Sequence, residues 1–169
     1  KSLEMTAEIK PFAKEYIPRI SQLTNKSNQF NLTTLRCSIA DIEEMAADEN
    51  WITLYGKLID KFGDNGVVSI LAAEIKPEAV NHLGKEAHIR LNLMSCRVLK
   101  RDMEFAMLDE LVRQAKAKNV TTLVGHYLPT KKNGMVAELY TDLGFTKEND
   151  IWTLDVNSYQ DQCHVITIN

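Results

Sequence analysis

One short segment, residues 133–145, carries side chains that can hold a ligand arm and move a proton. Asn133 opens the segment, Tyr140 lies two helical turns further on, and Gly144 ends it. An amide at a helix entrance, beside free backbone N–H groups, can bind amide or phosphate oxygens. A phenol has a pKa near that of a thiol, so Tyr140 can give a proton to a leaving thiolate. The alternative is that Tyr140 and Phe145 are ordinary core aromatics.

Cys96 and His126 are the other candidates for catalysis. The Cys96 thiol follows a long predicted strand and can carry an acyl group as a thioester, and the charge of neighbouring Arg97 would favour the thiolate. His126 ends the next predicted strand and can deprotonate Cys96 or an incoming thiol. Two alternatives stay open: Cys96 is a buried inert cysteine, and His126 is a strand-end histidine bonded to the main chain.

The long predicted strand, residues 86–98, has two different faces. Alternation places Ala87, Ile89, Leu91 and Leu93 on a core face. The opposite face, which can line a cleft, carries His88, Arg90, Asn92, Met94 and Cys96.

Hydrophobic periodicity and capping signals predict the other elements. Helices are expected at 17–28, from Ser38 (with a capping box to Asp41), at 103–118 and from Asn133. Further strands are expected at 33–37, 51–58, 67–75, 121–127 and 151–156, with a hairpin turn at 63–66 and one more strand in the tail. This order predicts an α/β (α+β) fold: a mixed, mostly antiparallel central sheet flanked by helices on both faces.

Composition bounds the class of protein. The 169 residues, 44% hydrophobic and 25% charged, suit one soluble globular unit. A net charge of −3 and only paired basic residues argue against nucleic-acid binding, and no 18-residue apolar run or signal-like start is present. Three distant cysteines and four scattered histidines form no metal-ligand spacing, so we expect no metal and a reducing, cytoplasmic location.

The element order and the spacing of Asn133, Tyr140 and Gly144 resemble the GNAT acyltransferase superfamily, whose members bind acyl-CoA or a pantetheine arm between two splayed central strands. Longer phrases at 17–34, 94–99 and 129–133 resemble the C-terminal region of FkbH-type proteins. The resemblance implies that Asn133 contacts a pantetheine arm and that Tyr140 is the general acid. The cofactor-binding residues expected from these phrases also include Met94, Leu99, Lys100, Arg101 and Lys132.

The pyrophosphate loop departs from the GNAT pattern. Where that pattern has Gln or Arg, then Gly, then Gly or Ala, this chain has Leu99, Asp102 and Glu104. Side chains obstruct close approach of phosphates to the backbone, and two carboxylates repel them, although Lys100 and Arg101 offset that charge. The departure favours the single phosphodiester of acyl carrier protein phosphopantetheine over CoA.

The FkbH resemblance implies a partner domain and a carrier. FkbH-type proteins join a phosphatase-like domain of the haloacid dehalogenase superfamily (HAD) to a GNAT-like domain and load a glyceryl unit onto an acyl carrier protein. We therefore expect residues 1–31 to be a helical lead-in from a missing upstream domain and residues 32–169 to be the acyltransferase domain. The alternatives are a non-catalytic module that docks the carrier protein, and an acetyl-CoA N-acetyltransferase.

Overall fold

The computed structural model describes residues 5–76, 84–95, 102–164 and 166–168. The strands are β1 (Thr6–Lys10), β2 (Trp51–Asp60), β3 (Gly63–Lys76), β4 (Lys85–Met94), β5 (Val120–His126), β6 (Thr146–Glu148), β7 (Ile151–Asp155) and β8 (Thr167–Ile168). The α-helices are α1 (Ile17–Lys26), α2 (Ile39–Ala47), α3 (Met103–Ala117) and α4 (Leu139–Asp142), and 3-10 helices cover Lys14–Tyr16 and Gly134–Val136. Within these residues, no helix is long and apolar enough to cross a membrane.

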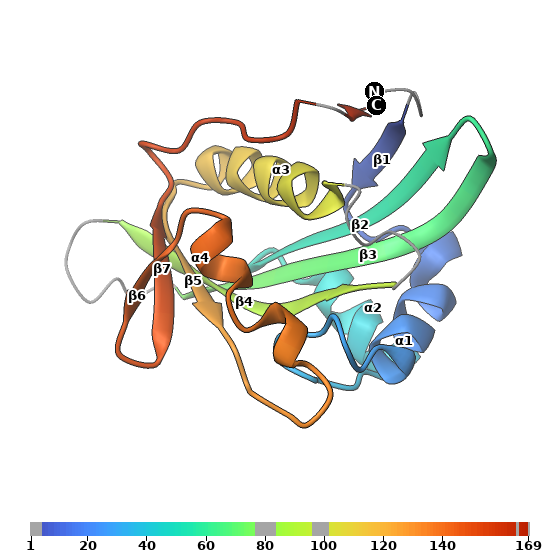
Figure 1. The fold of residues 1–169 in the computed structure, drawn as a ribbon, viewed down its shortest axis with the longest axis horizontal. Helices are drawn as coiled ribbons and strands as arrows, with labels where there is room; N and C mark the ends of the chain where they lie inside the picture. The colour runs from blue at the N-terminus through green and yellow to red at the C-terminus, as the bar shows by residue number, and fades with distance from the viewer. Residues whose placement is uncertain (1–4, 77–83, 96–101, 165, 169) are drawn as a thin grey trace.

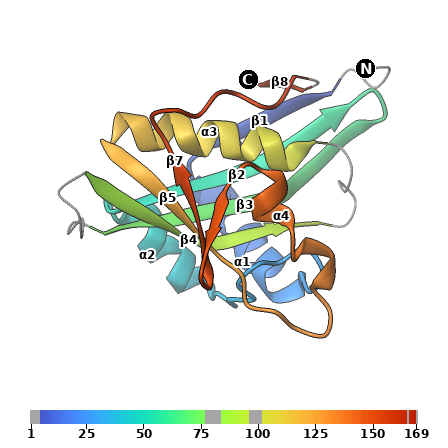
Figure 2. The same cartoon turned by 60° about the vertical axis from the view of Figure 1, so that its left-hand side comes forward.

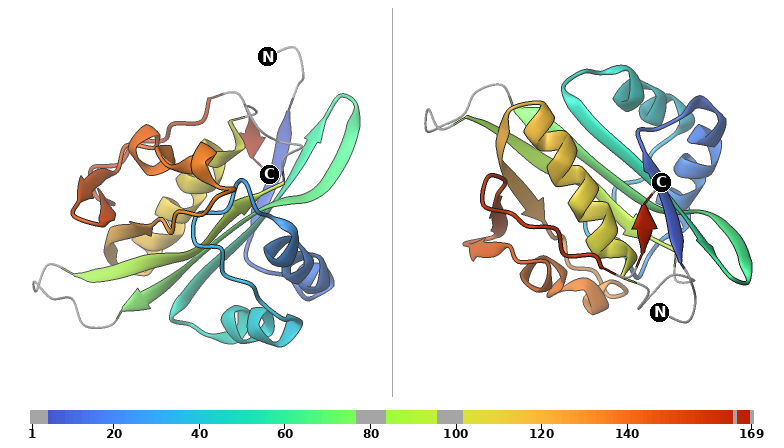
Figure 3. Two further views of the ribbon diagram at one scale, coloured as in Figure 1. Left: turned by 60° about the horizontal axis from the view of Figure 1, so that its bottom comes forward. Right: turned by 90° about the horizontal axis from the view of Figure 1, so that it is seen from above.

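All of these strands join one sheet, in the order β6-β7-β5-β4-β3-β2-β1-β8 (Figure 1). Pairing is antiparallel throughout except between β1 and β8 and between β4 and β5. Helix α3 covers one face, and α1 and α2 cover the other (Figure 3). The predicted fold class, a mixed and mostly antiparallel sheet with helices on both faces, is therefore confirmed.

Two apolar cores lie on the two faces of the sheet. The α3-side core contains the buried positions of α3 together with Leu139, Tyr140 and Phe145. The α1/α2-side core contains Ile20 and Leu23 of α1 and their neighbours on α2, β3 and β4. Strand β1 thus joins the sheet and the α3-side core, whereas helix α1 packs in the α1/α2-side core. The predicted boundary after residue 31 stays a prediction.

Several local predictions are confirmed, and two are wrong. Ser38 caps α2 with a reciprocal capping box to Asp41, as its sequence predicts. No strand forms at 33–37, where side-chain hydrogen bonds such as Thr33 Oγ1 to Arg90 O replace ladder pairing. The hairpin turn lies at 61–62, earlier than predicted, because Asp60 already pairs with Gly63.

A β-bulge in β4 corrects the predicted faces of that strand. Ala72 pairs with Leu91 and Ala73 pairs with Ile89, so Arg90 is an extra residue in the ladder. Ala87 and Ile89 accordingly pack in the α3-side core, whereas Leu91 and Leu93 pack in the α1/α2-side core. The second half of β4 is therefore turned over, which separates Asn92 and Met94 from His88.

Segment 133–145 is folded as two short helices rather than one. A 3-10 turn covers Gly134–Val136, and α4 begins only at Leu139. Gly144 ends α4 as predicted, with a φ of 97°, a left-handed conformation that favours glycine. The predicted inward face is confirmed, since Val136, Leu139, Tyr140 and Leu143 are all buried.

Candidate active site

The candidate site lies where β4 and β5 diverge. Their parallel pairing ends at His88 and Val124, after which the two strands separate (Figure 2). We call the space between residues 89–94 of β4 and 125–128 after this point the β4–β5 opening. Main-chain groups that face such an opening need other partners, because parallel pairing no longer satisfies them.

The chain's own segment 30–32 supplies those partners. Leu32 N donates to Asn92 O at 3.0 Å, and Met94 N donates to Phe30 O at 3.0 Å. On the other side, Leu128 N donates to Leu32 O at 2.8 Å. Segment 30–32 therefore bridges the two strands at the wide end of the β4–β5 opening.

Asn133 holds this bridge in place. Its side chain is fully buried, and its Nδ2 donates to Asn31 O and to Leu128 O, both at 2.9 Å. Its Oδ1 accepts from Thr130 N at 2.7 Å and from the Tyr127 hydroxyl at 3.3 Å. Protein groups thus occupy both amide atoms, and in this conformation the predicted contact between Asn133 and a pantetheine arm has no exposed atom to make it.

Tyr140 lies inside the opening, on the α3 face. Its side chain is 2% exposed and contacts the rings of Phe145 and Trp152. The ring lies flat against Gly125, where an added Cβ would come within 2.9 Å of three ring carbons. Glycine at position 125 is therefore required for the ring to reach this place.

The Tyr140 hydroxyl is held by two donors and keeps its own proton available. Its oxygen accepts from Asn92 Nδ2 at 3.2 Å and from the backbone N–H of His126. Burial raises the pKa of this phenol, and the two hydrogen bonds act against the rise. Within the described part of the chain, no acceptor takes the phenolic proton, so the group can donate it to a ligand.

His126 belongs to a hydrogen-bonded chain of three side chains. Its Nε2 lies 2.9 Å from His88 Nδ1, and His88 Nε2 lies 3.2 Å from Glu86 Oε1. A carboxylate only accepts, so we assign the proton of His88 to Nε2 and that of His126 to its own Nε2. This assignment leaves Nδ1 of His126 with a free lone pair, the atom that can accept a proton.

The surroundings of His126 keep it neutral. Burial lowers the pKa of its imidazole, with smaller contributions from His88 and Arg90. His126 also lines a cavity of about 620 Å³ with Tyr127 and Trp152, which gives it access to a bound molecule. This geometry suits a base, and the role of His126 as a base stays a prediction.

Met94 and Lys132, both predicted to bind the cofactor, line one cavity beyond the end of β4. Cys96, Leu99, Lys100 and Arg101 fall outside the described residues. Of the other two loop positions, Asp102 has a φ of 63°, a left-handed conformation typical of glycine. Burial raises the pKa of Glu104.

Sequence reasoning did not single out Asn92, His88 or Gly125 as site residues. The alternation of polar residues in β4 predicts that Asn92 and His88 share one face. The bulge at Arg90 instead places them on opposite faces of the sheet. Glycine at position 125, inside a predicted strand, signals a close approach of another group. Among the described residues, no cluster of three or more His, Cys, Asp or Glu side chains could hold a metal ion.

No family model matches this sequence. No curated protein matches it either. Solved structures do match, at low identity. A protein from Desulfovibrio desulfuricans assigned to the GNAT acetyltransferases superposes with a TM-score of 0.66 at 10% identity, covering 90% of this chain and 99% of its own.

Two further structures agree. Arabidopsis thaliana NAA60 in complex with acetyl-CoA gives a TM-score of 0.66 at 12% identity, over 89% of this chain and 99% of that one. A GNAT-family acetyltransferase from Streptococcus pneumoniae gives a TM-score of 0.63 at 15% identity, over 87% of this chain and 96% of that one. At such identities the likeness concerns the fold, and the chain therefore has the fold of the GNAT acetyltransferases.

Proposed function

We propose that this chain is an acyltransferase domain that takes its acyl group from a pantetheine thioester. One observation carries the proposal: the Tyr140 hydroxyl lies in the β4–β5 opening with its oxygen held by two donors and its proton without an acceptor in the described residues. The fold adds support, because the neighbour NAA60 is described in complex with acetyl-CoA, a thioester of the same kind.

The two sides of the opening divide the proton transfers. Nδ1 of His126 removes the proton of the acceptor nucleophile, which attacks the thioester carbonyl carbon. Collapse of the tetrahedral intermediate breaks the carbon–sulfur bond, and the thiolate takes the proton of Tyr140. Solvent then returns a proton to Tyr140, and His126 releases one.

The substrates are proposed from the sequence. The departures at Asp102 and Glu104 favour phosphopantetheine on an acyl carrier protein over CoA, and the FkbH resemblance favours a glyceryl group and an upstream HAD-type phosphatase-like domain as partner. Cys96 is proposed as the thioester carrier between donor and carrier protein. Cys37 is a suitable comparison because burial raises the pKa of its thiol to about 11, which keeps it protonated.

A docking module without catalysis is the second candidate, and a specific observation favours it. Asn92 O and Met94 N already bond to segment 30–32, so a pantetheine arm can pair with this edge only after that segment moves. A domain in which the segment never moves would still present its outer surface to a carrier protein.

Intact-protein mass spectrometry separates the two candidates. The chain is incubated with a phosphopantetheine-bearing carrier protein and either a glyceryl pantetheine thioester or acetyl-CoA, alone and with the upstream domain. We expect an acyl mass on the carrier protein, strongly reduced with the Tyr140→Phe variant. Binding of the carrier protein without any acyl gain would establish docking instead. Peptide mapping of hydroxylamine-sensitive adducts then tests Cys96, with Cys37 and Cys163 as internal controls.

A further inference from the structure

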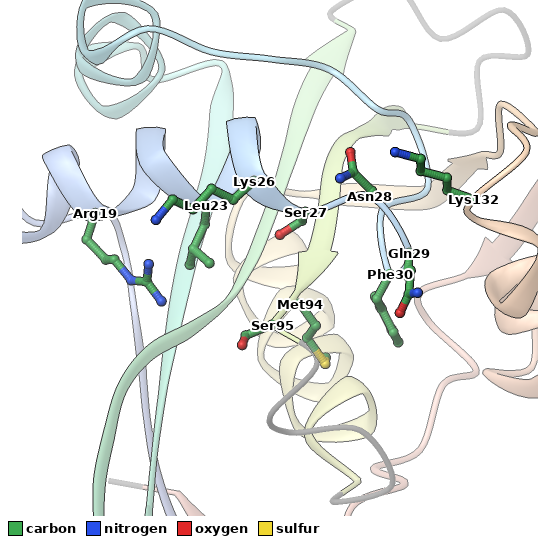
Figure 4. A pocket seen from close by; sticks show the side chains of 10 residues that line it. All are labelled: Arg19, Leu23, Lys26, Ser27, Asn28, Gln29, Phe30, Met94, Ser95 and Lys132. Atoms are coloured by element: carbon green, nitrogen blue, oxygen red, sulfur yellow. The ribbon is translucent and has the colours of Figure 1, made fainter.

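A second cavity lies at the end of β4, and Tyr140 is not among its lining residues (Figure 4). Its volume is about 650 Å³, and its walls come from α1, from the loop that follows α1, from Met94 and Ser95, and from Lys132. Leu23, Phe30 and Met94 supply apolar surface, while the rest of the lining is polar. The cavity is therefore large enough for the polar end of an extended ligand.

The charge of this cavity is of one sign. Three cationic side chains line it, Arg19, Lys26 and Lys132, and no carboxylate does so among the described lining residues. The ammonium groups of Lys26 and Lys132 have no ion pair and no side-chain hydrogen bond in the described part of the chain. In a chain of net charge −3, Lys26 and Lys132, with no carboxylate among the described lining residues, make a local field that favours an anion.

The wall between the lysines is fixed by Arg36. Its guanidinium donates to Ser27 O at 2.8 Å, near the C-terminal end of α1, and to Asn28 Oδ1 at 2.7 Å. Because the Asn28 oxygen already accepts from Arg36, the amide group that remains for a ligand is its NH₂ donor. Figure 4 shows Asn28 between Lys26 and Lys132, so N–H donors follow one another along this wall.

The position along β4 indicates what the anion belongs to. Met94 lines this cavity, and Asn92, two residues earlier, holds the Tyr140 hydroxyl in the β4–β5 opening. Asn92 and Met94 lie on the same side of the strand, beyond the bulge. Once segment 30–32 has left Asn92 O and Met94 N, a single elongated ligand running along β4 would present its reactive end to Tyr140 and its anionic end to the lysines.

We infer that this cavity binds the phosphate group of a phosphopantetheine arm, with Lys26 and Lys132 as its charged contacts and the Asn28 amide as a neutral donor. The inference rests on the proposed function for the thiol end of the arm. It adds Lys26 of α1 and the loop after α1 to Lys132, which the sequence resemblance already assigns to the cofactor.

Isothermal titration calorimetry with four probes tests the inference: pantetheine, phosphopantetheine, CoA and inorganic phosphate. We expect phosphopantetheine to bind roughly tenfold or more tightly than pantetheine, since a charge-assisted contact of this kind changes affinity by about that factor. The Lys26→Gln/Lys132→Gln double variant should lose this advantage. A Lys61→Gln/Lys116→Gln variant, with the same change in charge on exposed lysines elsewhere, should keep it.

The outcomes separate this inference from the proposed function. Equal affinity for pantetheine and phosphopantetheine, or equal losses in both double variants, would overturn the phosphate site and leave the acyltransferase proposal standing. Binding of phosphopantetheine and inorganic phosphate that depends on Lys26 and Lys132, without any binding of pantetheine, would support the phosphate site and count against the thioester site. A preference for CoA that survives the Lys26→Gln/Lys132→Gln change would place the phosphates elsewhere and also overturn the inference.

Discussion

The two faces of the sheet differ at the point where β4 and β5 separate. On the α3 face, Tyr140 and Asn92 are buried, and the phenol lies among aromatic rings. On the α1/α2 face, His88 and Glu86 are only partly buried, and they extend a polar chain to His126. One face is therefore suited to holding a neutral proton donor, and the other to accepting a proton near solvent.

His126 connects the two faces. Its backbone N–H bonds to the Tyr140 oxygen, while alternation with Gly125 places its imidazole on the opposite side of the sheet. The backbone N–H of His126 thus positions the proton donor, Tyr140, and the side chain of His126 is the proton acceptor. The two groups nevertheless lie in separate environments. A change on the α3 face should therefore affect the rate, and a change on the α1/α2 face should affect its pH dependence.

Removing the proton donor should have the largest effect. Tyr140→Phe keeps the ring against Gly125 but deletes the hydroxyl, so turnover of an acyl-pantetheine thioester should fall by roughly a hundred- to ten-thousand-fold. Release of free thiol measures the rate, and circular dichroism checks the fold. Tyr16→Phe, which removes a hydroxyl bonded to Lys57 far from the opening, should keep full activity. Unchanged turnover in Tyr140→Phe would leave the ring as a core aromatic.

Loss of the anchor of segment 30–32 should have the next largest effect. Asn133→Ala removes the partners of Asn31 O and Leu128 O, which lie in a buried region, so the free energy of unfolding should drop by about 2–4 kcal/mol. Urea denaturation measures this loss. Asn65→Ala removes one bond, to Leu58 O in the β2–β3 hairpin, and should cost about 1 kcal/mol. Equal losses in the two variants would contradict the anchoring role.

A methyl group at position 125 tests the packing under the Tyr140 ring. The added Cβ of Gly125→Ala would meet ring carbons at 2.9 Å, and the ring cannot move freely among Phe145 and Trp152, so we expect a loss of about 1–3 kcal/mol. Gly134→Ala is the matched control, because no atom lies within 4 Å of its added Cβ. Chemical denaturation compares the two, and an equally stable Gly125→Ala variant would show that the ring has room to shift.

Local signals in the sequence predicted much of the fold. The capping box at Ser38 and the stop at Gly144 depend on residues only a few positions apart, so they can be identified without tertiary information. The α3 stripe of apolar residues is similarly visible as a helical period. Tyr140 could be proposed from its spacing, but its free proton could not, since its partner Asn92 is 48 residues away.

What the sequence could not supply depends on long-range register. The bulge at Arg90 exists only relative to β3, and no periodicity within β4 reveals it, so the strand was assigned one polar face. The local sequence predicts that Asn133 binds a ligand at a helix entrance. Its actual partner, Asn31, lies 102 residues earlier and cannot be identified from that segment. His88 was likewise not paired with His126, since 38 residues and a sheet contact separate the two rings.

The smallest expected effect concerns pH. The lowered pKa of His126 keeps its imidazole neutral, so the acid limb of the rate profile should lie below the ordinary value of about 6.5. Stability follows the same sign: it is complete above the unfolded pKa and is lost as pH falls through the folded pKa. His88→Gln removes one of the two neighbours, His88 and Arg90, that lower this pKa, whereas burial remains. The acid limb should therefore move part of the way toward the ordinary value.

Titration of the His126 ring signals by NMR measures this shift directly. His164→Gln, a change at an exposed histidine, should leave the His126 titration in place. If His88→Gln also leaves it in place, the hydrogen-bonded chain on the α1/α2 face does not tune the base, and burial alone sets its pKa. If the pKa rises while the rate of the neutral form is unchanged, His88 acts through the protonation of His126.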